Sequence, residues 1–204
     1  MERYLLTHSL LSSWLYAMKS SPYEDMTTDN DPLSEFLRVL RREPTDTNEA
    51  MRNGIEFEDL VTQIAFGEDA DTEHKWYSAA CKAAQKVKGG VTQYKAKADI
   101  DVSGMNILLY GRIDFLKAGE VIDTKFSKGY ERGKYIESTQ HPVYLRLIPE
   151  AHTFTYLVSN GTEVWTETYR RDETCDIEPI IADFFRWLDE NGYMDVYKKY
   201  WVTL

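Results

Sequence analysis

The hydrophobic pattern of this chain changes period once, near residue 90, and this change most constrains the fold. Upstream of it, apolar residues recur at helical spacing in four segments, near residues 9–18, 31–40, 47–66 and 72–88. The glycines Gly89 and Gly90 end the last of these segments. Downstream, alternate positions from Thr92 to Ile100 are apolar or small, which is typical of a β-strand. Such a chain is expected to pack helices on a sheet.

The second half of the chain continues the strand pattern and closes with helices. Strands are predicted at 105–116 and 120–126 around a tight turn, and at 152–159 and 163–170 around Asn160-Gly161. A short helix is predicted near 139–148. The fold class predicted is α/β (α+β), with a central mixed β-sheet flanked by helices. We expect a single domain over 1–204, with N-terminal helices at 1–88, a core sheet with the site at 91–170, and C-terminal helices at 175–204.

Composition excludes several classes of protein. With 204 residues and 43% hydrophobic content, the chain has enough apolar residues for a core. Two cysteines cannot form a four-cysteine zinc or iron–sulfur site, and no apolar run is long enough to cross a bilayer. We therefore expect a cytoplasmic protein without membrane contacts.

Net charge alone does not indicate a nucleic-acid binder. The formal charge of −10 has the wrong sign for a non-specific one. The charges are unevenly distributed, however, because no acid lies between Glu73 and Asp99, and six lysines do. Taken by charge alone, these lysines are a solvated face.

Two acids and a lysine are expected to converge at one hairpin. Asp114 follows an apolar strand, and Asp123 and Lys125 lie on the next strand. Side chains alternate along a strand, so Asp123 and Lys125 point to one face, and a short hairpin brings Asp114 beside Asp123. Mg²⁺ or Mn²⁺ would compensate two adjacent carboxylates. The alternative is a surface Asp123–Lys125 ion pair with Asp114 capping a turn.

Glu58 is a third candidate acid. On a helical wheel of residues 49–65 it falls at the margin of the apolar arc, whereas the other acids of this helix lie opposite. An acid turned towards the core is costly unless it meets a cation. The alternative is that Glu58 extends to water from the boundary.

In order and spacing, these residues resemble the PD-(D/E)XK nucleases, most closely the RecB-like and lambda-exonuclease-like exonuclease branch. The likeness rests on Glu58 with Gly54 four residues before it, Asp114, Asp123-Thr124-Lys125, and Gln140 followed by Tyr144. The segments 6–11 and the tryptophan-rich C-terminal helix are also similar to RecB-like chains. The resemblance implies a restriction-endonuclease-like core. Glu58 stands where many RecB-type members carry histidine, and the cysteines of the iron–sulfur branch are missing, so no cluster is expected.

The resemblance implies Mg²⁺-dependent hydrolysis of DNA phosphodiester bonds, with Mn²⁺ able to substitute. Asp114 and Asp123 would ligate the metal, helped by Glu58 and the carbonyl of Thr124. Lys125 would hold or deprotonate the attacking water, or stabilise the transition state. Gln140 would touch the substrate phosphate or a water at the site, with Tyr144 beside it on the same helix face.

The implied partner is DNA, with a recombination or annealing protein as a further candidate partner. Lys95, Lys97 and Lys128 would contact the DNA backbone in a salt-sensitive, sequence-blind manner. An exonuclease of recombination, repair or phage type is the first hypothesis. An endonuclease or junction resolvase, and a catalytically silent DNA- or partner-binding scaffold, are the alternatives, and a homo-oligomer is left open.

Overall fold

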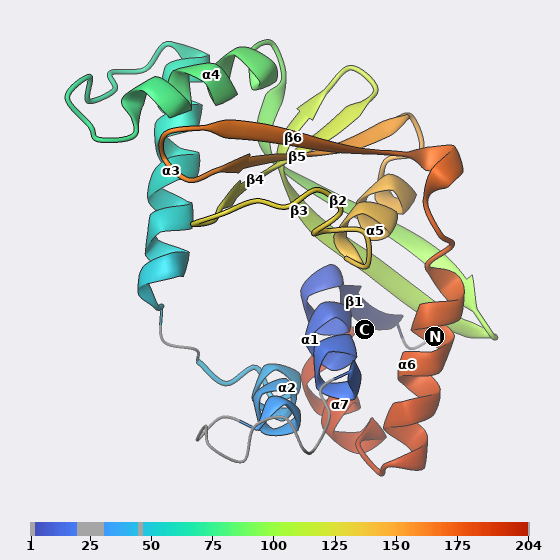
Figure 1. Cartoon of the computed structure of the whole chain (residues 1–204). Helices are drawn as coiled ribbons and strands as arrows, with labels where there is room; N and C mark the ends of the chain where they lie inside the picture. Colours follow the sequence, from blue (N-terminus) through green and yellow to red (C-terminus); the bar gives the residue numbers. More distant parts are fainter. Residues whose placement is uncertain (1–2, 20–30, 45–46, 204) are drawn as a thin grey trace.

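A mixed seven-stranded sheet forms the centre of the structure. The computed structural model describes residues 3–19, 31–44 and 47–203, and within them the strand order is β6-β5-β4-β3-β1-β7, with β2 also paired to β3. The strands are β1 Arg3–Thr7, β2 Val91–Val102, β3 Met105–Lys117, β4 Glu120–Phe126, β5 Thr153–Ser159, β6 Val164–Arg170 and β7 Val202–Thr203 (Figure 1). The central mixed sheet flanked by helices, expected from the sequence, is confirmed.

The two edges of β3 are occupied differently, and this difference positions the site. β2 pairs antiparallel with β3 along almost its whole length, from Val91↔Leu116 to Val102↔Met105. On the other edge, β1 pairs in parallel only up to Thr7↔Tyr110, and β4 pairs antiparallel only from Phe115↔Ile122 onwards. Residues 111–114 of β3 therefore have no strand partner on that edge within the described chain.

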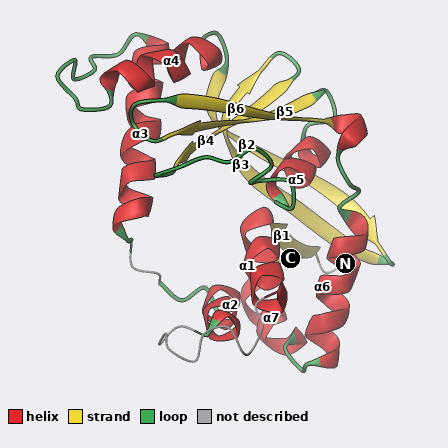
Figure 2. Ribbon diagram, viewed as in Figure 1, coloured by secondary structure: helices red, strands yellow, loops and turns green. Residues whose placement is uncertain are grey.

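Helices cover both faces of the sheet, as Figure 2 shows by element type. The helices are α1 His8–Lys19, α2 Pro32–Leu40, α3 Glu49–Phe66, α4 Tyr77–Val87, α5 Gln140–Leu147, α6 Glu178–Glu190 and α7 Met194–Trp201. One core lies between α3, α4 and one sheet face, which contributes Phe115, Ile122 and Leu157. A larger core joins α1, α2, α5, α6 and α7 to the opposite face, where Ile113, Val121 and Tyr156 lie.

The local sequence accounts for most element ends. Asp31 accepts hydrogen bonds from the backbone N–H groups of Leu33 and Ser34 and so caps α2, and Asn48 caps α3 in the same way. Gly67 ends α3 in the left-handed conformation, with φ of 73°. The first strand is a departure from the sequence prediction of N-terminal helices, because Arg3–Thr7 forms β1. The Thr7 hydroxyl accepts a hydrogen bond from Leu10 N at the start of α1.

The two ends of the described chain lie side by side. β7 pairs antiparallel with β1 through Tyr4↔Val202 (Figure 1). The Tyr197 hydroxyl also donates to the carbonyl of Leu5 at 2.8 Å. These contacts fix the start of α1, which borders the site. No described helix is long and apolar enough to cross a membrane.

Candidate active site

The candidate site lies where β3 and β4 separate. The β3–β4 ladder ends at Phe115↔Ile122, so Asp114 and Asp123 are the first residues beyond the paired region. There the Asp114 carboxylate takes the place of a backbone acceptor, because its Oδ2 accepts a hydrogen bond from Thr124 N at 3.0 Å. The hairpin thus brings Asp114 beside Asp123, as its length predicted.

Asp123 is the buried centre of the site, with a protein donor at each carboxylate oxygen. Its side chain is 4% exposed, and its Oδ2 lies 2.6 Å from Lys125 Nζ. Its Oδ1 accepts a hydrogen bond from Nε2 of Gln140, the first residue of α5. Burial alone would lower the pKa of Lys125, but the charge and hydrogen bond of Asp123 outweigh burial and raise it. The pair is therefore not the surface ion pair of the alternative interpretation.

Glu58 reaches the same site from α3, which covers the other face of the sheet. Burial raises the pKa of Glu58, and the negative charge of Asp123 raises it further. Its Oε1 accepts from Nε2 of Gln93, a β2 residue with an unusual φ of +53°. Glu58 is thus partly buried and hydrogen-bonded instead of extending freely to water.

The three carboxyl groups interact electrostatically. Burial raises the pKa of Asp114 well above its usual range, and the charges of Asp123 and Glu58 add to this effect. The cations that oppose them are Lys125 and Arg112, the latter acting on Glu58. When all three carboxyls are ionised, their two neighbouring cations leave an excess of negative charge, and a divalent cation would offset it.

A cavity of about 280 Å³ lies beside Asp114 and Asp123, along the edge of β3 where residues 111–114 have no strand partner. Tyr144 forms part of its wall and donates a hydrogen bond to the Arg112 carbonyl at 2.9 Å, which holds α5 against that stretch. A Cβ on Gly111 would lie 2.6 Å from Tyr144 Cε1, so this position requires glycine. The cavity is lined by Thr7, His8, Ser9, Tyr110, Gly111, Arg112, Asp114, Asp123, Gln140 and Tyr144.

His8 forms the opposite wall, at the start of α1. Its ring meets that of Tyr144 edge-on, with 5.3 Å between centroids. Burial, followed by the positive charge of Lys125, lowers the pKa of His8 to about 4. At neutral pH it is therefore an uncharged imidazole facing the acids.

The chemistry of the donor set fits a hard divalent cation, although the side chains engage protein donors here. Carboxylate oxygens are the ligands that Mg²⁺ and Mn²⁺ prefer. Among residues 3–19, 31–44 and 47–203, no group of three or more His, Cys, Asp or Glu side chains is arranged to hold a metal ion. The amine of Lys125 and the amide groups of Gln140 and Gln93 engage Asp123 and Glu58 instead. Metal binding would require these donors to shift.

The structure brings together six of the residues singled out in the sequence, namely Glu58, Asp114, Asp123, Lys125, Gln140 and Tyr144. Thr124 adjoins them through its hydrogen bond to Asp114. Lys95, Lys97 and Lys128 are exposed and outside the cavity, and Lys95 pairs across the strands with Arg112. The roles assigned to these residues stay predictions.

Sequence reasoning missed Arg112 and Gln93 as neighbours of the site. An arginine within an apolar strand, two residues before Asp114, was a signal for Arg112. Gln93 had no such signal, because its place depends on an irregular backbone within β2.

Comparison with known proteins supports the fold alone. No protein-family model matches the chain, and no curated protein matches it. The chain is similar to a solved structure described as "Crystal structure of SSO0001", with a TM-score of 0.51 and 15% sequence identity. The similarity covers 92% of this chain and 77% of that one. At this identity the likeness carries no inference about activity.

Proposed function

We propose that the protein is a divalent-metal-dependent nuclease that hydrolyses DNA phosphodiester bonds, and that it acts as an exonuclease. One observation carries the proposal. Buried Asp123 forms an ion pair with Lys125 and accepts a hydrogen bond from Gln140, just beyond the end of the β3–β4 ladder. Asp114 and Glu58 interact electrostatically with it there. Buried like charges lower stability, and residues with perturbed pKa values cluster at functional sites. This arrangement is therefore a candidate for catalysis.

Each residue has a role that follows from its place. Asp114, Asp123, Glu58 and the carbonyl of Thr124 would hold the metal ion. Mg²⁺, when bound, lowers the pKa of water and polarises a phosphoryl oxygen. Lys125 is held beside Asp123 as a cation, where it can orient the attacking water or neutralise charge that develops on the phosphate.

The helix α5 supplies orientation. Gln140 has a side-chain amide whose Nε2 donates to Asp123, and in the substrate complex this donor can turn to a phosphate oxygen. Tyr144 keeps α5 against β3 through the Arg112 carbonyl, so its contribution is to hold Gln140 in place.

Outside the cavity, exposed lysines provide the sequence-independent part of DNA binding. Lys95 and Lys97 lie on β2, and Lys128 follows β4. Contacts from such side chains to phosphates release counterions, so affinity should fall steeply as salt concentration rises. This local positive charge allows a chain of net charge −10 to bind a polyanion.

A cleavage assay with matched variants tests the proposal. End-labelled linear DNA and supercoiled plasmid are incubated with the protein and Mg²⁺ or Mn²⁺. Lys125→Ala should abolish cleavage and retain Mn²⁺ and DNA binding, whereas Asp123→Ala should lose Mn²⁺ binding as well. The control is Lys198→Ala, an exposed lysine of α7.

Degradation from the ends with intact plasmid is the expected result. Nicked plasmid would favour the endonuclease or resolvase alternative. DNA binding without hydrolysis at any metal concentration would favour the scaffold alternative. Full activity of both Lys125→Ala and Asp123→Ala would refute the assignment.

A further inference from the structure

A second buried acid, Glu167, lies on β6 outside the cavity. Glu167 is 8% exposed. The described residues place no cation in an ion pair with it. Four donors converge on its carboxylate instead. Oε2 accepts from the Tyr130 hydroxyl at 2.6 Å and from Gly133 N at 3.1 Å. Oε1 accepts from Tyr135 N at 3.3 Å and from the Tyr169 hydroxyl.

Only a carboxylate can serve all four donors. An ionised carboxylate accepts at both oxygens, whereas a glutamine amide accepts at one oxygen and donates at its nitrogen. Burial raises the pKa of Glu167, but the bonds from Tyr130, Tyr169 and two backbone N–H groups outweigh burial and lower it. Glu167 is thus ionised at neutral pH, and its four hydrogen bonds are charge-assisted, which makes them stronger than neutral ones.

The first consequence of these hydrogen bonds to Glu167 concerns the position of Lys125. Three of the four donors belong to the segment 130–135, which connects β4 to α5, so Glu167 ties this segment to β6. The Tyr135 ring then stacks on Tyr156, with centroids 4.4 Å apart and planes at 23°. Tyr156 pairs across the strands with Asp123, and Lys125 Nζ lies 5.9 Å from its ring centroid. The Tyr156 ring therefore borders the amine of Lys125, and Tyr135, stacked on Tyr156, interacts electrostatically with that amine.

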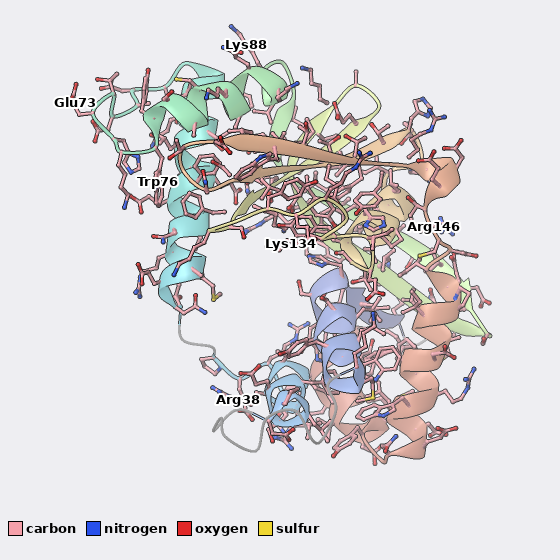
Figure 3. All side chains as sticks on the ribbon, in the orientation of Figure 1. Arg38, Glu73, Trp76, Lys88, Lys134 and Arg146 are labelled. Carbon is pink, nitrogen blue, oxygen red and sulfur yellow. The ribbon has the colours of Figure 1, made fainter. Side chains whose placement is uncertain are left out.

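A further set of contacts holds the segment 130–135 in place. In the view of Figure 3, the labelled Lys134 marks the segment between the sheet and α1. Lys134 Nζ donates a hydrogen bond at 2.8 Å to the hydroxyl of Ser127, the residue that directly follows β4. The ring of Tyr130 stacks on Trp165 of β6, with 5.7 Å between centroids. These contacts keep the segment beside β4 and β6.

The second consequence concerns Gln140. The fourth donor to Glu167, Tyr169, stacks its ring on His141 with centroids 4.1 Å apart and planes at 7°. His141 is the second residue of α5, directly after Gln140, and is 3% exposed. The orientation of the first turn of α5 is thus linked to Glu167, and with it the hydrogen bond from Gln140 to Asp123.

Lys125 and Gln140, the two side chains that contact the Asp123 carboxylate, are therefore both linked to Glu167. We propose that Glu167 is a positioning residue, which fixes Lys125 through Tyr135 and Gln140 through Tyr169 and His141. This inference rests on the proposed nuclease function for its kinetic consequence. Because Glu167 touches none of the candidate DNA-binding lysines, its loss should lower kcat much more than it changes substrate affinity.

Glu167→Gln tests the inference, with Glu163→Gln as the control. Glu163 is an exposed acid in the turn before β6, and both substitutions remove one charge. The first readout is independent of activity. It is the rate at which acetic anhydride modifies the Lys125 amine, measured by mass spectrometry relative to the exposed Lys198. In folded Glu167→Gln this rate should rise several-fold, and in Glu163→Gln it should equal that of the unmodified protein.

The second readout is the split between kcat and KM for DNA cleavage. Glu167→Gln should lower kcat by about 10- to 100-fold, as expected for a small displacement of reacting groups, and change KM much less. If Glu167→Gln fails to fold, Tyr130→Phe removes one hydrogen bond and should show the same two effects in weaker form.

The outcomes separate the two proposals. Unchanged Lys125 modification in a folded Glu167→Gln protein would overturn the positioning role, whatever the cleavage result. A rise in KM with constant kcat would also overturn it. Absence of cleavage by the unsubstituted protein would refute the nuclease function alone, and the modification experiment would still decide the role of Glu167.

Discussion

Replacing Lys125 with methionine removes the ammonium group from the site and keeps most of the side-chain volume. The amine lies 2.6 Å from Asp123 Oδ2, and the buried Oδ2 has no hydrogen-bond partner in the described chain beyond this ion pair. After substitution, Asp123 would remain buried beside Asp114 and Glu58 with less positive charge nearby. The protein should therefore be less stable, even though methionine fills the space well.

The size of this loss follows from burial. Removing one partner of a buried ion pair costs about 3–5 kcal/mol. The Lys125 side chain is 33% exposed, so water screens part of the charge and the lower end, about 3 kcal/mol, applies. For a chain of this length that corresponds to a fall in Tm of about 6–12 °C.

Urea denaturation of a double-mutant cycle measures the interaction. Lys125→Met should cost about 3 kcal/mol in the natural background but less than about 1 kcal/mol in Asp123→Asn, because the charge it neutralised is gone. Lys97→Met, an exposed lysine of β2, is the control and should change stability little. Equal costs in both backgrounds would refute the reasoning that Lys125 stabilises Asp123.

Three further predictions concern the surroundings of the site. Gly111→Ala should cost about 1–3 kcal/mol in urea denaturation, since its Cβ would lie 2.6 Å from Tyr144 Cε1; unchanged stability would contradict the close approach of α5. Arg171 donates to the carbonyls of Leu145, Ile148 and Ala151 at the end of α5. Arg171→Ala should cost about 2–3 kcal/mol, whereas the exposed Arg170→Ala should cost almost nothing, and similar losses would argue against this cap. Burial lowers the pKa of His141 to about 4, so the unfolded chain gains a proton first as pH falls, and His141 should by itself lower stability by about 2–3 kcal/mol between pH 6.5 and 4, in addition to the contribution of His8. His141→Phe should remove the His141 share of this fall, and an unaltered pH–stability curve would exclude His141 as a contributor.

The sequence predicted the elements that depend on local pattern. The strand β4 has the predicted ends, Glu120 and Phe126, because its apolar residues and the glycine before it are local signals. The end of α3 at Phe66 was predicted for the same reason. The start of α4 was placed too early, at Thr72. The helix begins at Tyr77, after a turn in which the Trp76 N–H donates to His74 Nδ1.

Pairing between segments that are distant in the sequence could not be predicted from the local hydrophobic pattern. The five residues of β1 run directly into α1, and only their parallel pairing with β3, about a hundred residues later, makes them a strand. Residues 111–114 lack a partner on one edge of β3 because β1 and β4 share that edge and neither reaches these residues.

The acids of the site were predictable from order and spacing, whereas their supporting residues were not. Glu58, Asp114, Asp123 and Lys125 stood out because charged residues interrupt apolar segments. Glu167, in contrast, lies on a strand with a half-polar sequence, and three of its four donors come from the distant segment 130–135. His8 and Arg112 likewise become neighbours of the acids only through the tertiary fold.

Mn²⁺ binding, followed by electron paramagnetic resonance, decides whether the three acids hold a divalent cation. The protein should bind Mn²⁺, and Asp114→Asn should weaken this binding strongly, because Asp114 is one of the three interacting acids. Asp183→Asn, an exposed acid of α6, should bind as the natural sequence does. Equal Mn²⁺ affinity in the natural protein and in Asp114→Asn would contradict the claim that these acids hold a divalent cation.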